Sequence, residues 1–202
     1  MNLLSKLRQS VLAAAFAVLA IPAGYAAPIM YGADLGNFEN PPTGSAGTGT
    51  AFVTFDSVAH TLRVQVSFSG LLAGVTASHI HCCVAPPGNV GVATTTPTFP
   101  GFPSGVMSGT YDNTFDTTLA SSFNAAFVTA NGGTPAGAEA ALDAGLAADM
   151  AYFNIHTSLF PSGEIRGFLT PVPEPEVYAM LSAGLGLMGF LARRRRRQDT
   201  AS

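Results

Sequence analysis

Basic residues are almost absent from the middle of this 202-residue chain. Between residues 27 and 172 there is no lysine, and Arg63 and Arg166 are the only basic residues other than histidine, against nine acidic residues. With histidine neutral, this part of the chain carries a net charge of −7. Such a surface would repel a phosphate backbone, so we expect no nucleic-acid partner. The missing lysines also exclude a catalytic lysine amine from this region.

The sequence motifs of common catalytic sites are missing as well. The chain has no Gly-x-Ser-x-Gly nucleophile motif and no glycine-rich phosphate loop of the required form. Glu164 and Arg166 lie two residues apart in a predicted strand, where a structural ion pair or a cross-strand pair explains them better than acid catalysis does. We therefore predict a binding or structural protein rather than an enzyme.

Cysteine occurs only as the adjacent pair Cys82 and Cys83, so no disulfide can join distant parts of the chain. In an exported protein two thiols tend to oxidise. This pair could close a disulfide between neighbouring residues, which makes a strained ring, or it could bridge to another chain. Free thiols and metal ligation are the alternatives.

The start of the chain has the composition of a targeting segment. Residues 1–26 combine Lys6 and Arg8 with the apolar run 11–21 and a small-residue site that ends at Ala26, as a secretory signal peptide does. A membrane-spanning anchor is the alternative, but the apolar run falls short of the roughly 20 residues that a span needs. We expect export across the inner membrane, with cleavage after Ala26.

The other end of the chain has the composition of a membrane anchor. Residues 177–192 carry no charge, and the five arginines Arg193 to Arg197 follow them. A short apolar helix that ends at a basic cluster is typical of a transmembrane anchor with its arginines in the cytoplasm. Alone it is a marginal span. We predict a transmembrane helix here, either as a temporary tether or as a permanent anchor.

Alternation of apolar and polar residues predicts the fold between the two ends. Residues 51–55 and 62–68 alternate as half-buried antiparallel strands do. Further strands are predicted at 75–81, 152–156 and 164–169, with turn residues between them. The sequence thus predicts an all-β fold, an antiparallel Greek-key sandwich or barrel.

One stretch inside this pattern has helical spacing instead. In residues 117–150 the apolar residues recur as on the buried side of two short helices. Thr117 or Thr118 could cap the first helix, and Thr134 the second. We expect a short helical insertion into the β-domain. Residues 28–50 are rich in glycine, proline and asparagine, which predicts a loop or a poorly ordered arm.

Three of the four histidines lie in two of the predicted strands. In an extended chain His79 and His81 share one face while Ile80 points to the other. His156 and Asn154 share a face of the second strand in the same way. If the apolar faces of two adjacent strands met the same core, the three imidazoles would converge on the opposite side of the sheet.

A cluster of imidazoles is typical of zinc and copper sites. In this interpretation His79, His81 and His156 are metal ligands. The alternative is that they are structural residues, each hydrogen-bonded to loop backbone as buried polar groups usually are. The fourth histidine, His60, lies between two strands and is expected to be a solvated turn residue.

The two histidine motifs also carry a family resemblance. His79-Ile80-His81 and Asn154-Ile155-His156-Thr157, with residues 161–167 behind the second motif, resemble the CHRD domain over residues 31–170. The resemblance implies an immunoglobulin-like or similar β-barrel in an extracellular protein, in a family without an established activity. The same His-x-His pair occurs in copper–zinc superoxide dismutase, itself a Greek-key barrel. Many members have glycine-rich sequence after this pair, where the present chain has Cys82 and Cys83.

The last part of the chain, residues 171–202, resembles the PEP-CTERM sorting signal. Pro173, Glu174 and Pro175 precede the apolar helix, and the basic cluster that begins with Arg193 and Arg194 follows it. The resemblance implies recognition by an exosortase, a membrane enzyme that cuts near the motif and releases its substrate to the cell surface or its polysaccharide matrix.

Together these observations predict an exported binding or structural module, transiently anchored in the membrane and then held at the cell envelope, at the surface or outside the cell. Its expected partners are an exosortase-type enzyme and an exopolysaccharide or other surface proteins. The alternative function is zinc or copper binding, or metal-dependent catalysis, at the three histidines.

Overall fold

The computed structural model describes residues 27–173, 180–190 and 193. The predicted signal peptide, residues 1–26, lies outside the described residues. So does much of the predicted sorting signal, including Glu174, Pro175 and Arg194. The predicted anchor at 177–192 is described only in part, as a helix over residues 180–190. Among the residues that are described, no helix is both long enough and apolar enough to cross a membrane.

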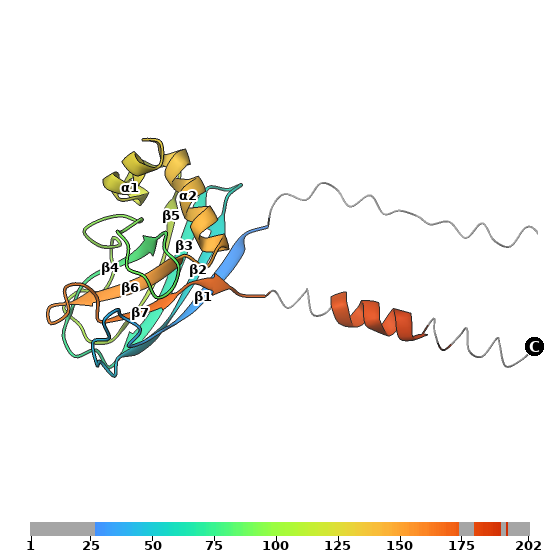
Figure 1. The fold of residues 1–202 in the computed structure, drawn as a ribbon, viewed down its shortest axis with the longest axis horizontal. Helices are drawn as coiled ribbons and strands as arrows, with labels where there is room; N and C mark the ends of the chain where they lie inside the picture. The colour runs from blue at the N-terminus through green and yellow to red at the C-terminus, as the bar shows by residue number, and fades with distance from the viewer. Residues whose placement is uncertain (1–26, 174–179, 191–192, 194–202) are drawn as a thin grey trace, which may run out of the picture.

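Two antiparallel sheets pack as a sandwich, which confirms the predicted all-β class (Figure 1). The strands are β1 (Ile29–Leu35), β2 (Thr48–Asp56), β3 (Thr61–Ser69), β4 (Val75–Cys82), β5 (Gly109–Asp116), β6 (Ala151–Thr157), β7 (Ile165–Phe168) and β8 (Thr170–Pro171). The large sheet has the order β5-β3-β2-β1-β8, and the small sheet has the order β4-β6-β7. The chain passes from the small sheet back to the large one at Leu169, between β7 and β8.

The large sheet has one buried and one solvent-facing side, as the alternating sequence predicted. In β3 the buried residues Leu62, Val64, Val66 and Phe68 alternate with more exposed ones. The hairpin between β2 and β3 pairs every residue of both strands in register. Alternating side chains point to opposite faces of a sheet, so the apolar set of each strand meets the core.

Strand β1 corrects the prediction of a loop over residues 28–50. It pairs along its whole length with β2 and at two positions with β8. Its buried Tyr31 and Leu35 join the core. Small residues between them hid this strand from the sequence pattern, and its stability comes from backbone hydrogen bonds to β2 rather than from its own composition.

The helical insertion packs at one end of the sandwich (Figure 1). It consists of the 3-10 helix η2 (Ala120–Ser122), α1 (Ala125–Ala130) and α2 (Pro135–Ala147). Thr134 caps α2 as predicted, since its hydroxyl accepts from the backbone N–H of Gly137.

The first helix begins later than predicted, because Asn124 caps α1. The hydroxyl of Thr117 is used elsewhere: it donates a hydrogen bond to the buried carboxylate of Glu139.

The small sheet is buried on both sides, in contrast to the large one. Every residue of β6 is buried. One side carries Ile80, Phe153 and Ile155, which belong to the core. The other side carries polar residues, and the loops that follow β1, β4 and β6 supply hydrogen bonds to it. This covered polar side holds the candidate site.

Candidate metal centre

The candidate site lies on the covered side of the small sheet, which we call the histidine face and define as His79, His81, Tyr152, Asn154 and His156. Strands β4 and β6 are antiparallel neighbours, with His79 opposite Asn154 and His81 opposite Tyr152. The structure thus brings the three predicted histidines together. Their ring centroids lie 5.1 to 5.9 Å apart.

Each of these imidazoles hydrogen-bonds a loop carbonyl through one ring nitrogen. His79 Nε2 lies 2.6 Å from the Pro97 carbonyl oxygen, His81 Nδ1 lies 2.7 Å from that of Val90, and His156 Nδ1 lies 3.0 Å from that of Pro161. The donor and acceptor roles follow from chemistry. A carbonyl only accepts, so the bonded nitrogen of each ring carries the proton and the other nitrogen keeps a lone pair.

The remaining nitrogens have no hydrogen-bond partner. These are Nδ1 of His79, Nε2 of His81 and Nε2 of His156, all buried. One ring nitrogen from each histidine lies within 4.8 Å of the others. Two nitrogens bound to one tetrahedral zinc ion at about 2.1 Å are about 3.4 Å apart, so small side-chain movements would close the three around an ion.

Burial keeps these histidines neutral. It lowers the pKa of His79 to about 4, an effect that the charge of a protonated His156 would reinforce and the hydrogen bond to Pro97 opposes. Burial likewise lowers the pKa of His81 to about 4 and shifts the pKa of His156 downward. Only neutral imidazole ligates a metal ion, so the site is ready for a metal at neutral pH.

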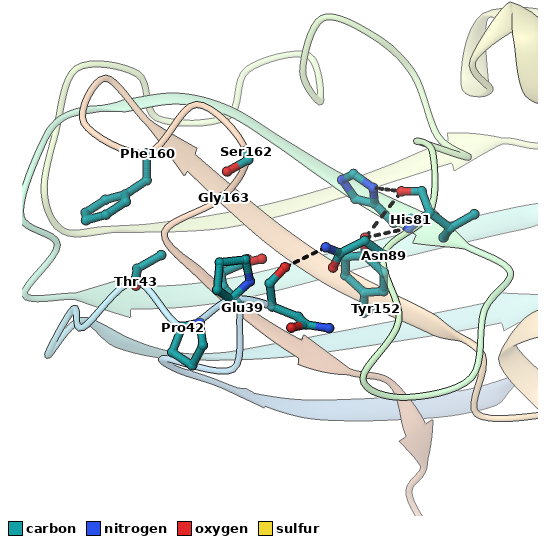
Figure 2. Close-up of a pocket in the computed structure, with 12 residues that line it drawn as sticks. Glu39, Pro42, Thr43, His81, Asn89, Tyr152, Phe160, Ser162 and Gly163 are labelled. Carbon is teal, nitrogen blue, oxygen red and sulfur yellow. Dashed lines mark hydrogen bonds between the residues drawn. The ribbon is translucent and has the colours of Figure 1, made fainter.

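A pocket of about 390 Å³ opens beside His81 (Figure 2). Tyr152 stacks on His81 at 4.8 Å between ring centroids, and both side chains line this pocket. The loop after β1 supplies Glu39, and the loop after β6 supplies Ser162 and Gly163. The pocket therefore joins the histidine face to the solvent.

Sequence reasoning missed Glu39, because a single acidic residue in a loop gives no signal. Its side chain is only 9% exposed, and its Oε1 has no hydrogen-bond partner. Burial raises the pKa of Glu39 to about 7, although nearby Arg166 pulls it down. Gly163 packs its backbone against this carboxyl: a Cβ there would stand 2.5 Å from Glu39 Oε1 and 2.5 Å from Asn154 Oδ1.

Arg166 and Glu164 form no ion pair with each other, which was one of the two arrangements expected from the sequence. Arg166 is fully buried and donates to the Phe38, Pro87 and Gly88 carbonyls and to the Asn89 side chain. Its Nε lies 3.8 Å from Glu39 Oε2.

Glu164 has partners of its own. It accepts hydrogen bonds from the hydroxyls of Ser45 and Thr157 and from the backbone N–H of Leu72. Glu164 and Arg166 lie two residues apart in the sequence, but they bind different loops.

The two cysteines form a disulfide with each other. Cys82 is buried in the core, and Cys83 packs against the core with its sulfur near the Ala141 carbonyl of α2. A Cβ on Gly145 of the same helix would collide with both sulfurs. The disulfide therefore packs against α2, and glycine is needed where the helix meets it.

His60 is the one histidine outside the cluster, and it is not simply solvated as expected. Its side chain is 48% exposed, but Nδ1 lies 3.0 Å from Glu139 of α2. It therefore ties the β2–β3 turn to the helical insertion.

Comparison with known protein families matches residues 32–169 to the CHRD domain and residues 171–197 to the PEP-CTERM protein-sorting motif. Both agree with the resemblances read from the sequence. The sorting motif implies export, C-terminal anchoring for sorting and recognition by an exosortase-type enzyme. Comparisons with curated proteins and with solved structures found no match. The CHRD match covers more than half of the chain, and the protein therefore belongs to the CHRD domain family.

Proposed function

We propose that this protein is a metal-binding module of the cell surface, in which His79, His81 and His156 bind copper(II) or zinc. Two observations support this: each of the three buried imidazoles keeps one ring nitrogen without a hydrogen-bond partner, and one ring nitrogen from each histidine lies within 4.8 Å of the others. Three neutral nitrogen donors suit both ions, and a given nitrogen site generally binds copper(II) more tightly than zinc.

The alternative is that the histidines only stabilise loops. It explains one of the two nitrogens of each imidazole ring. Loop carbonyls account for one nitrogen of each ring. They leave three lone pairs buried without a donor, and a buried polar group without a partner costs about 1–3 kcal/mol. A metal ion would satisfy all three at once. The carbonyls would then act as outer partners that fix the tautomer and orientation of each ligand.

The module acts as a binding protein rather than as an enzyme in this proposal. The histidine face offers neutral nitrogen donors beside a pocket, an arrangement that suits the binding of a metal ion. The sorting motif supports a location at the cell envelope or surface, after release from the membrane tether. An exopolysaccharide or another surface protein stays a predicted partner, to which a metal-loaded module would bind.

The test is a metal titration of the full chain, purified in detergent and stripped of metal. We expect one equivalent of copper(II) and, in a separate titration, one equivalent of zinc to bind. His81→Asn should weaken both affinities at least a hundredfold, because an amide is a poor substitute for imidazole on these ions.

The matched control is the same substitution at the exposed histidine, His60→Asn, which should bind metal as the parent does. Asparagine tolerates the positive φ of 55° that residue 60 has. Equal affinities in the parent and in folded His81→Asn protein would reject the metal site and leave the histidines as structural residues.

A further inference from the structure

We infer that the histidine centre is an open site, where a small anion enters through the pocket beside His81 and completes the coordination of the bound ion. This inference rests on the proposed metal binding. It adds a ligand class and a route of entry, and it assigns the pocket a role.

Three protein ligands leave a coordination position free. Among the described residues, the candidate ligand group contains His79, His81 and His156, and no other histidine, cysteine or acidic residue joins it. Zinc is usually four-coordinate, and sites with three protein ligands keep the fourth position for water or an exogenous ligand. Closed structural sites, by contrast, use four protein ligands.

The pocket supplies a route to this position. His81 is the one member of the three histidines that lines it. His79 and His156 do not line the pocket, and all three side chains are largely buried, at 6–8% exposed. A volume of about 390 Å³ is at the small end of ligand sites. This volume suits a small molecule.

The charges around the pocket favour an anion. A bound divalent ion would place two positive charges beside His81, and the buried guanidinium of Arg166 lies under Tyr152 at 4.7 Å from the ring centre. Glu39 is the one acidic residue among the lining residues. Burial raises its pKa to about 7. Its Oε2 lies 3.8 Å from Nε of Arg166, so the guanidinium offsets the charge of this carboxylate.

Azide is a suitable probe because it is small, anionic and changes the absorption and EPR spectra of copper(II) when it binds. The full chain is first loaded with one equivalent of copper(II) and then titrated with azide. We expect a saturable spectral change. Ser162→Trp should weaken azide binding at least tenfold, because the indole fills the mouth of the pocket, and it should leave copper affinity unchanged.

Ser158→Trp is the matched control: residue 158 is exposed in the same loop but does not line the pocket. It should bind azide as the parent does. Copper that binds tightly without any spectral response to azide would overturn the open site and leave the metal site intact. So would equal azide affinities in the two tryptophan variants. Failure to bind copper at all would instead reject the proposed function, and the inference with it.

Discussion

The two sheets of this protein use their outer faces in opposite ways. The large sheet turns its outer face to solvent, so β3 alternates between buried and more exposed residues. The small sheet has its outer face covered by loops, so all seven residues of β6 are buried. A covered polar face needs a partner for every polar atom. The small sheet can therefore hold ionisable groups in fixed positions, which a solvated face cannot do.

The two arginines of the β-domain show the same difference between a solvated and a covered outer face. Arg63 lies on the solvated face and forms a two-point ion pair with Asp112, with both side chains 49% exposed. Arg166 lies on the covered face, is fully buried and ties the loops after β1 and β4 to the small sheet. An arginine thus forms an exposed ion pair on the large sheet, whereas on the small sheet an arginine holds loops in place from a buried position.

The largest effect is expected on the inner face of the large sheet. Val64→Asp places a carboxyl in the core without a partner, since Val64 is fully buried. We expect the free energy of unfolding to fall by at least about 4 kcal/mol, measured by urea denaturation. Ser67→Asp on the exposed side of the same strand is the control and should change it by less than about 0.5 kcal/mol. Similar losses for both variants would show that β3 does not separate core from solvent.

The next largest effect compares the two arginines. Arg166→Ala should lower the free energy of unfolding by about 3–5 kcal/mol, because it leaves Glu39 and several loop carbonyls buried without a donor. Arg63→Ala should cost no more than about 1 kcal/mol, as exposed ion pairs do. Both values come from urea denaturation under one set of conditions. Equal costs would remove the distinction between the two outer faces.

A smaller effect is expected from pH, in metal-free protein. The folded pKa of His79 and of His81 is about 4, below the usual 6.5. Between these values the unfolded chain takes up protons that the native state does not. Stability is therefore complete above pH 6.5 and falls as the pH drops toward 4.

Glu39 opposes this trend, because its raised pKa lets the native state take up a proton first between pH 4.5 and 7. The histidines outnumber it, and we expect a net loss of about 3 kcal/mol from pH 6.5 to 4. Glu39→Gln should steepen the loss, and His81→Asn should flatten it, in urea midpoints taken across this range. A parent protein equally stable at both pH values would contradict the neutral histidine cluster.

Local sequence predicted the parts of the fold that depend on local physics. Strand β3 followed from its alternation, and α2 followed from its apolar stripe and from Thr134 as its cap. Strand β1 escaped prediction, because its partner β2 rather than its own composition makes it a strand.

The candidate site divides in the same way. The alternation of apolar and polar residues placed His79, His81 and His156 on the polar faces of their strands. This alternation is a local property of the sequence. Their carbonyl partners, and the approach of Glu39 to Arg166 across 127 residues of chain, come from loops without periodicity. Such contacts depend on the tertiary fold, so the local sequence could not indicate that Glu164 and Arg166 each bind distant loops.

The central claim is that the covered face of the small sheet binds a metal ion through three histidines, and anomalous diffraction from crystals soaked in zinc tests it most directly. We predict one strong peak among His79, His81 and His156, about 2.0–2.1 Å from one nitrogen of each ring. The nitrogens bound to Pro97, Val90 and Pro161 should keep those hydrogen bonds. Zinc bound only at surface acidic residues, with the three inner nitrogens still apart, would contradict the account.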